Sequence, residues 1–340
     1  KMSERTLPPP TLPKGPILVT GASGFLGCVL VRRLLLDGLH QGQLRCLVRD
    51  VAKAEAVGLP SACLVVGDLR DPGCDSDLRR AAEGVEVVVH LAGSTKAYDR
   101  RGFHDVNVQG TRRLLDAVVA TAPDAHFVHV SSLAAAGPSL DGSTSTVLAD
   151  QARTVSNYGE SKRLGEIQVG ESGLPFTILR PPIVYGPNDA ATQLLFRQAL
   201  ALVTAVPWKS RPLSVMHAMD VAEALWLAVQ RRPRGVTLPL EGPERTDTHA
   251  LLRAIAAACG GKARLVRVPL FMAGLAARAG DLWARMRRQP SYFNRDKVRE
   301  IAAVGWVADG ESAREHLGFV ATTTLPEGLR EVANADGFAS

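Results

Sequence analysis

A phenol and an amine that could exchange a proton lie four positions apart, at Tyr158 and Lys162. On a helix, this spacing places both side chains on one face. The pKa of a free tyrosine is about 10, and a neighbouring ammonium lowers it by stabilising the phenolate. Upstream, Ser132 follows a strand-like run, where its hydroxyl can hold a substrate oxygen beside Tyr158. Such a pair also occurs by chance on surface helices, but its order after Ser132 favours proton transfer at a carbonyl or carbinol group.

A glycine-rich turn near the start of the chain predicts the site of a dinucleotide that exchanges hydride. The turn follows the apolar run 17–19 and precedes a helical pattern. Gly21 allows the sharp turn, Gly24 lets a pyrophosphate approach the backbone, and Gly27 lets the helix pack closely on the strand. The phosphates then meet the free amides and the positive dipole of the helix start. We expect these turn residues to bind the cofactor: Gly21, Ser23, Gly24, Phe25, Leu26 and Gly27.

The end of the second expected strand indicates which nicotinamide cofactor binds. NAD sites usually carry an acidic residue there, whereas this strand ends in Arg49 and Asp50, with Lys53 close behind. A guanidinium pairs with a phosphate through charge-assisted hydrogen bonds, so Arg49 favours NADPH. Alternatively, Arg49 is a surface residue and Asp50 binds the ribose of NAD. Asp68 and Leu69 are expected to reach the adenine. Leu91, Ala92 and Gly93 are expected on the ribose and nicotinamide side, and Lys162 is expected to bond to the nicotinamide ribose.

The elements that must position these groups alternate between strand and helix, which is typical of βαβ units. The strand-like runs are apolar throughout, so we expect them to be buried on both faces of a parallel sheet. The sequence therefore predicts an α/β fold with a doubly wound parallel sheet. The expected strands are 17–20, 44–48, 63–66, 85–91, 127–130 and 176–180, and the expected helices are 26–36, 78–82, 106–120 and 158–171.

Beyond Pro187 the helical segments are broken by proline and glycine loops, which favours a smaller, mixed C-terminal region. We expect a disordered lead-in at 1–14 and a dinucleotide-binding domain at 15–187, to which 213–231 return. Residues 188–212 and 232–340 are expected to form the substrate-binding region. Helices in this half are expected at 193–202, 221–229, 249–259, 271–286 and 295–303.

The composition is that of an ordinary globular protein: of 340 residues, 46% are hydrophobic and 22% charged. The five cysteines lack CxxC spacing, which favours reduced thiols in the cytoplasm. The net charge of +6 is modest, and its arginines lack interleaved aromatic residues, so no nucleic-acid partner is expected. No apolar stretch is long enough to span a bilayer. These features favour a cytoplasmic enzyme with a small-molecule substrate.

Several segments resemble those of the extended short-chain dehydrogenase/reductases, the NAD-dependent epimerase/dehydratase superfamily. Together these segments fall within residues 16–230, and the whole set is far more specific than any single segment. The resemblance implies a Rossmann fold, oxidoreductase activity on CH–OH or C=O groups, and pairing of subunits as a possible homodimer. The matching segments are Thr20–Gly27, Gly67–Leu69, His90–Gly93, Asn107–Thr111, Ser131–Gly137, Tyr158–Lys162, Arg180–Pro187 and Met216–Ala222.

The same resemblance assigns further residues. It implies that Ser132 rather than Ser131 is the catalytic serine, that Asn107 belongs to the catalytic set, and that Pro181 and Ile183 pass beside the nicotinamide. The chain departs from the family where Val-Tyr-Gly often follows the serine, because it has Ala-Ala-Gly at 135–137. Dehydratases carry a threonine and an acidic pair at the serine position. The absence of that pair here argues against a dehydratase.

The substrate side is less defined. Residues 265–286 are apolar with arginines at intervals, and four interpretations stay open: a helix beside the cleft, a lid, a membrane-surface helix or a helix packed on the core. In placement the segment is similar to that of 3β-hydroxysteroid dehydrogenase-like and dihydroflavonol or cinnamoyl reductase-like members. His126 and His129 have no third ligand nearby, so no metal site is expected. His217 either lines the substrate site or packs in the core.

These observations favour an NADPH-dependent reductase of a ketone or aldehyde on a fairly apolar small molecule. Two alternatives use the same residues differently. A nucleotide-sugar epimerase would keep NAD bound and transiently oxidise its substrate. A non-catalytic NADP-binding sensor or interaction protein would use the fold alone, and the intact set of Ser132, Tyr158 and Lys162 weighs against it.

Overall fold

A seven-stranded parallel sheet forms the centre of the molecule, in the order β3-β2-β1-β4-β5-β6-β10. The computed structural model describes residues 7, 9–142, 153–272, 274, 275, 277, 280 and 295–339. The strand order reverses direction between β1 and β4, as in a doubly wound nucleotide-binding fold. The strands are β1 (Ile17–Thr20), β2 (Leu44–Val48), β3 (Leu64–Val66), β4 (Val87–His90), β5 (His126–Val130), β6 (Phe176–Arg180) and β10 (Val236–Pro239).

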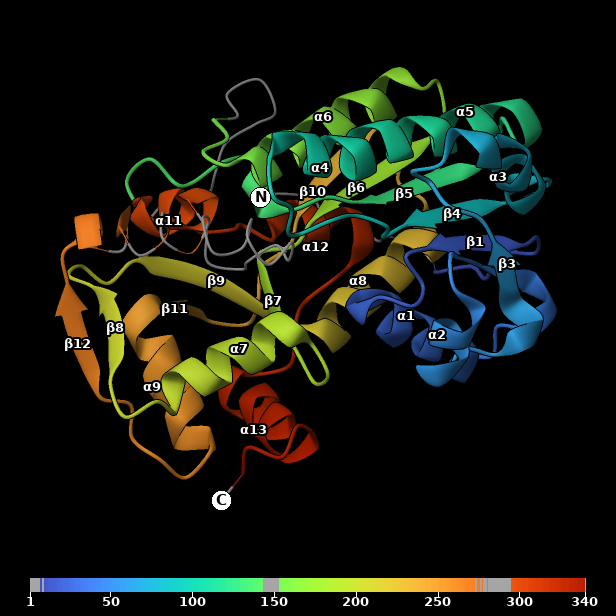
Figure 1. The fold of residues 1–340 in the computed structure, drawn as a ribbon. Coiled ribbons are helices and arrows are strands. Elements are labelled where there is room, and N and C mark those ends of the chain that lie inside the picture. The colour runs from blue at the N-terminus through green and yellow to red at the C-terminus, as the bar shows by residue number, and fades with distance from the viewer. Residues whose placement is uncertain are drawn as a thin grey trace, which may run out of the picture.

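Helices cover both faces of this sheet (Figure 1). One face carries α1 (Phe25–Leu36), α2 (Val51–Ala56), α8 (Ala218–Arg231) and α12 (Glu311–Leu317), and the other carries α3 (Asp75–Ala82), α4 (Arg100–His104), α5 (Thr111–Thr121) and α6 (Asn157–Glu171). The strands β1, β4 and β5 are buried along their whole length, because each side chain meets a helix layer. The predicted α/β doubly wound fold is therefore confirmed.

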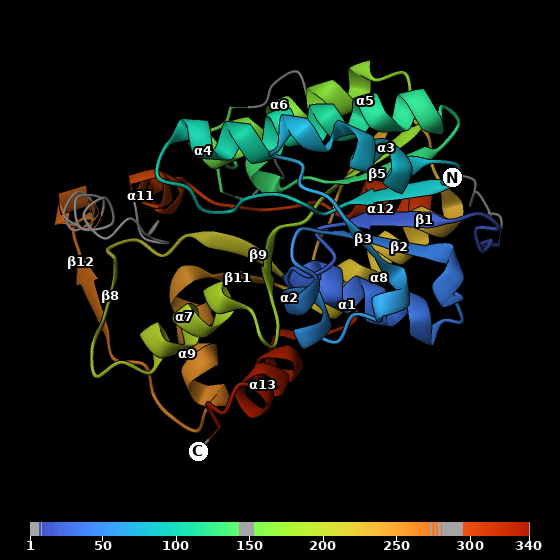
Figure 2. The same ribbon diagram turned by 45° about the vertical axis from the view of Figure 1, so that its right-hand side comes forward.

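A second, smaller core lies beside the sheet and is built largely from later residues (Figure 2). It contains a three-stranded sheet, β11-β9-β7, and a two-stranded parallel sheet, β12-β8. The strands are β7 (Ile183–Tyr185), β8 (Thr204–Pro207), β9 (Pro212–His217), β11 (Arg245–Asp247) and β12 (Leu265–Val268). The helices of this region are α7 (Ala190–Ala199), α9 (Thr248–Ala258), α11 (Arg295–Ala302) and α13 (Leu325–Ala335).

Several observed elements were not among the predicted ones, such as α2, α4, α12, α13 and the strands after Pro181, and two further differences concern predicted elements. The expected helix 106–120 is divided into a π-type turn, η4 (Asp105–Gly110), and α5. The return to the main sheet does not end at 231, because β10 pairs with β6 and α12 packs on α8. Part of the predicted lead-in (1–6 and 8) and part of the predicted helix 271–286 (273, 276, 278, 279 and 281–286) lie outside the described residues.

Within the described part of the chain, no helix is long and apolar enough to cross a bilayer. All five cysteines are free thiols, and burial raises the pKa of Cys46 to about 12, so this thiol stays protonated and unreactive.

Candidate functional site

The turn between β1 and α1 lies against the loop that follows β4, at the point where the strand order reverses. Gly21 has a φ of 71°, and a Cβ there would stand 2.7 Å from the backbone nitrogen of Ala92. A Cβ on Gly27 would stand 2.2 Å from the carbonyl oxygen of Gly21. Only glycine fits either position, so the backbone forms a tight cradle whose walls are main-chain groups.

The start of α1 supplies the groups that an anion needs. Its first turn contains no acidic residue, and no side chain caps its amides. The free amides and the helix dipole therefore favour a negative charge at this end. A dinucleotide pyrophosphate fits this cradle. The ring of Phe25 lies beside Gly186, and Leu26 packs on the core, so these two side chains hold the helix start in place.

Three charged residues after β2 have exposed side chains, and one of them caps a helix. Asp50 caps α2, because its Oδ1 accepts a hydrogen bond from the backbone nitrogen of Lys53 at 3.0 Å. The alternative role of Asp50 as a ribose ligand would compete with this capping bond. The side chains of Arg49 and Lys53 are exposed.

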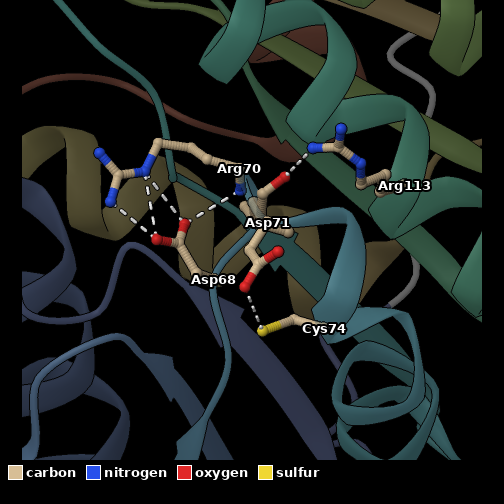
Figure 3. Close-up of polar contacts among 6 residues, drawn as sticks. Asp68, Arg70, Asp71, Cys74 and Arg113 are labelled. Carbon is tan, nitrogen blue, oxygen red and sulfur yellow. Dashed lines mark hydrogen bonds and ion pairs between the residues drawn. The ribbon is translucent and has the colours of Figure 1, made fainter.

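The segment after β3 forms a polar corner with the start of α5 (Figure 3). Arg70 grips both carboxylate oxygens of Asp68, with Nη2 2.7 Å from Oδ2 and Nε 3.1 Å from Oδ1. These bonds lower the pKa of the Asp68 carboxyl, and the nearby Arg49 adds to the effect. Leu69 has a buried side chain, and its carbonyl accepts a hydrogen bond from Arg113 at 2.8 Å. A cavity of 290 Å³ lies at this corner.

The predicted proton-transfer groups meet at the end of β5. The hydroxyl of Ser132 lies close enough to the phenol of Tyr158 to lower its pKa, and it accepts a hydrogen bond from the backbone nitrogen of Ala134 at 3.2 Å. Tyr158 lies in the first turn of α6, close to the short helix η5 (Leu133–Ala135). A Cβ on Gly159 would stand 2.5 Å from the carbonyl oxygen of Ala134. Glycine at this position lets α6 approach η5 closely enough to bring the hydroxyls of Tyr158 and Ser132 near each other.

The protonation state of Tyr158 differs from the expected one. Burial raises the pKa of this phenol to about 12, a nearby Glu300 adds to the rise, and the bond to Ser132 opposes it. Lys162, which was expected to lower this pKa, is not among the groups that shift it. At neutral pH the phenol keeps its proton, which suits a proton donor rather than a base.

Lys162 is buried one helical turn beyond Tyr158. Its Nζ donates a hydrogen bond to the carbonyl oxygen of Val130 at 2.6 Å. Burial lowers the pKa of this ammonium to about 8, and the charge of Glu166 opposes that shift. A buried cation thus stands at the end of β5 beside the proton-transfer groups.

Asn107 joins three elements at the same site. Its Oδ1 accepts a bond from the backbone nitrogen of Ser94 at 2.7 Å, and its Nδ2 donates to the carbonyl of Ser94 at 3.0 Å and to the hydroxyl of Ser161 at 2.8 Å. It lies in the π-type turn η4, a kind of turn that is frequent at functional sites. Both amide hydrogens are in use, so we treat Asn107 as a positioning residue of α6.

Two acidic residues that sequence reasoning missed face this site from α11. The carboxylate of Asp296 accepts bonds from the backbone nitrogen and Nδ2 of Asn157, at 2.9 and 3.1 Å, and so holds the first residue of α6. Glu300, one turn later, acts on Tyr158. The four-residue spacing within the expected helix 295–303 was visible, but nothing in the sequence placed that helix beside α6.

The other predicted residues take varied positions. The carbonyl of Pro181 accepts a bond from the backbone nitrogen of Leu133 at 2.9 Å, which places its segment beside Ser132, and Ile183 is exposed. The buried ring of His217 packs edge-on against Tyr185, with centroids 5.2 Å apart, which favours the packing interpretation. Ser23, Leu91, Ala92 and Gly93 lie in the two loops that form the cradle.

Comparisons with known proteins match most of the chain. The model of the NAD dependent epimerase/dehydratase family matches residues 17–238. A ceramide reductase of Caulobacter vibrioides is 36% identical over 300 residues, 86% of this chain and 86% of the relative. Sterol demethylase protein B of Methylococcus capsulatus is 32% identical over 323 residues, 90% of this chain and 94% of the relative. The structure of Thermus thermophilus UDP-glucose 4-epimerase with NAD has a TM-score of 0.73 at 21% identity, covers 94% and 98% of the two chains, and supports the fold alone.

Proposed function

The chain belongs to the NAD-dependent epimerase/dehydratase family, and from this premise we propose that it is an NADPH-dependent reductase of a ketone or aldehyde on a fairly apolar small molecule. Family membership and the reductase among its relatives indicate an NAD(P)-dependent oxidoreductase. The observation that supports the narrower proposal is the placement of Ser132, at the start of η5, beside Tyr158 in the first turn of α6, with a phenol that keeps its proton. A proton donor is what reduction of a carbonyl requires.

When bound, the reduced nicotinamide supplies hydride to the carbonyl carbon. Tyr158 donates its phenolic proton to the developing alkoxide, and Ser132 holds the same oxygen by a hydrogen bond. The ammonium of Lys162 stabilises the phenolate that remains, and it is available to the ribose of the cofactor. Asn107 and Asp296 hold α6 in the position that brings Tyr158 to Ser132.

An apolar substrate is supported by the relatives and by the side of the site that α11 covers. The two relatives are named for reactions on ceramide and sterol, both of which are largely apolar molecules. A cavity beside α11 is lined mainly by apolar groups, among them Pro138, Leu140, Val155 and Val304. The unpaired thiols support a reducing compartment, and we propose the cytoplasm.

The test is consumption of NADPH, followed by absorbance, with a panel of long-chain keto-lipids, steroid-like cyclic ketones and small aldehydes. We expect turnover with at least one apolar carbonyl compound. The parallel arm incubates the protein with UDP-glucose or UDP-galactose and measures their interconversion. If the nucleotide sugars interconvert without net cofactor consumption and no carbonyl compound is reduced, the protein is an epimerase and not a reductase. Silence in both arms, with NADPH bound, would favour a binding protein.

The lowered pKa of Lys162 predicts the pH dependence of this reduction. Its ammonium is charged below about pH 8 and loses its proton above it, whereas Tyr158, with a pKa of about 12, stays protonated through this range. The kcat/KM for reduction should therefore be level at neutral pH and fall as the pH rises through about 8, since kcat/KM reports the free enzyme. In Lys162→Arg the fall should move to higher pH. The same fall in Lys162→Arg as in the wild type would show that another group titrates.

Arg49 is expected to decide the choice of cofactor. Loss of a charge-assisted bond to phosphate costs about 1.5–3 kcal/mol, so Arg49→Ser should raise the KM for NADPH about tenfold to hundredfold and leave that for NADH unchanged. The matched control is Asp50→Asn, because asparagine keeps the capping bond of α2 while removing the charge. If Asp50→Asn instead weakens NADH and Arg49→Ser changes neither cofactor, Asp50 binds the ribose and the enzyme uses NAD.

A further inference from the structure

An exposed apolar surface stands at one end of the small parallel sheet, away from the main sheet. The strands β8 and β12 run parallel and in register, with Pro207 opposite Val268. Trp208 follows β8 directly, and a helical stretch begins at Leu270, two residues after β12 ends. Because both segments leave the sheet at the carboxyl ends of the two parallel strands, Trp208 lies beside that stretch. We call the exposed apolar residues of these two segments the apolar edge: Trp208, Phe271, Met272 and Leu275.

The apolar edge is unusual for the surface of a globular protein. Its side chains are 64%, 69%, 49% and 58% exposed, in the order given. Single exposed apolar residues are common and need no explanation, but neighbouring large ones mark an interaction surface. On β12 itself, Val266 is also 49% exposed. Trp and Phe in particular are favoured where an apolar phase meets water.

The two segments that carry the apolar edge have charges of one sign. Residues 200–212 and 260–275, which form β8, β12 and their ends, contain no Asp or Glu. They contain five basic residues: Lys209, Arg211, Lys262, Arg264 and Arg267. Lys209 and Arg267 are exposed beside the apolar edge. Apolar and aromatic side chains with a basic surround are complementary to an interface of acyl chains and anionic headgroups.

The place of the apolar edge connects it with the catalytic groups. In both ribbon views, the orange helical stretch after β12 lies beside α11 (Figures 1 and 2). The same helix α11 holds the start of α6 through Asp296. An apolar substrate that enters from this end would therefore meet α11 before it reaches Tyr158.

We propose that the apolar edge docks on the surface of a lipid bilayer that contains anionic lipid. Trp208, Phe271 and their neighbours enter the interface, and Lys209 and Arg267 contact the headgroups. Docking would place the site beside the phase in which an apolar substrate is dissolved. That last role rests on the proposed function, whereas the docking itself does not.

The experiment measures sedimentation of the full chain with vesicles of phosphatidylcholine, with and without phosphatidylglycerol, in the absence of substrate. We expect binding to the mixed vesicles, weaker binding to phosphatidylcholine alone, and release by salt. Binding should also shift the tryptophan emission to the blue, and Trp208→Phe should remove that shift. Phe271→Ser should lower the partition coefficient about tenfold. Leu36→Ser, at a leucine at the end of α1 that is 82% exposed, should not change it.

Charge variants separate the electrostatic contribution. Lys209→Gln with Arg267→Gln should lower binding to the mixed vesicles at least about tenfold and leave binding to phosphatidylcholine unchanged. The matched pair, Arg79→Gln with Arg112→Gln on α3 and α5, should behave as the wild type. Equal losses in both pairs would show non-specific attraction and overturn the proposal.

Two other results would also overturn it. One is absence of vesicle binding by the wild type. The other is a dimer in size-exclusion chromatography that Phe271→Ser dissociates while vesicles stay unbound, because the apolar edge would then cover a second copy. A protein that reduces apolar ketones without binding vesicles would lose the docking proposal alone. A protein that binds vesicles but reduces nothing would lose the proposed function alone.

Discussion

Tyr158→Phe should lower kcat for reduction by about a thousandfold, within the range of general acid catalysis. The change removes one oxygen and keeps the ring that packs 6.0 Å from Phe103, so the fold and the cradle should not change. Ser132 loses the neighbouring phenol oxygen of Tyr158, but its hydroxyl keeps the hydrogen bond from the backbone nitrogen of Ala134. The dissociation constant for NADPH, measured by fluorescence titration, should therefore stay within about twofold of the wild type.

The matched control is Tyr98→Phe, at a tyrosine that is 46% exposed, whereas Tyr158 is only partly accessible and faces the reacting groups. It should reduce the substrate at the rate of the wild type. Ser132→Ala should lie between the two, since it removes a hydrogen bond to the substrate oxygen but leaves the proton donor. If Tyr158→Phe keeps more than about a tenth of the activity, the proton comes from another group and the mechanism proposed here is wrong.

The arrangement of the cofactor cradle could be predicted from the sequence, because its determinants are local. The position of Gly21 between a strand and a helix predicts a backbone shape, and the structure shows the positive φ and the close approach that this shape requires. The four-residue spacing of Tyr158 and Lys162 likewise follows from helix geometry alone, and both lie on α6.

The protonation of Tyr158 could not be predicted in the same way. Spacing suggests that Lys162 controls this pKa, but burial dominates, and the amount of burial depends on elements far away in the chain. One of these, α11, brings Glu300 and Asp296 to α6 from more than a hundred residues downstream. The partner of the Lys162 ammonium, the carbonyl of Val130, is a backbone group that no sequence pattern marks.

Contacts between distant segments also explain why the observed fold differs from the predicted elements. Apolar periodicity continues across 106–120, so it predicts one helix, whereas the structure has the π-type turn η4, in which Asn107 bonds to the distant Ser94 and Ser161. Strand β10 is short and only partly buried, and its sequence alone does not separate it from a loop. It is defined by pairing with β6, which is a tertiary contact.

A buried ion pair beneath the catalytic groups carries the second large prediction. Glu166, one turn beyond Lys162 on α6, accepts two bonds from Arg180, at 2.8 and 2.7 Å, and one from Ser131 at 2.6 Å. All three side chains are buried. Removing one partner of such a pair leaves an uncompensated charge, which costs about 3–5 kcal/mol. Glu166→Gln should therefore lower the free energy of unfolding by about that amount in urea denaturation.

The chain offers a control with the same chemistry on the same helix. Glu160 forms a two-bond pair with Arg100, but this pair is exposed, so Glu160→Gln should cost less than about 1 kcal/mol. Replacing both members, in Glu166→Leu with Arg180→Leu, should recover part of the loss, because the buried Arg180 charge is removed, whereas Arg163 and Lys162 still lose the carboxylate. Glu166 also opposes the lowering of the pKa of Lys162. In Glu166→Gln, the fall of kcat/KM with pH should thus begin below pH 8, an effect that loss of packing alone would not produce. If Glu166→Gln destabilises no more than Glu160→Gln and leaves the pH profile unchanged, the buried pair supports neither the fold nor the charge on Lys162.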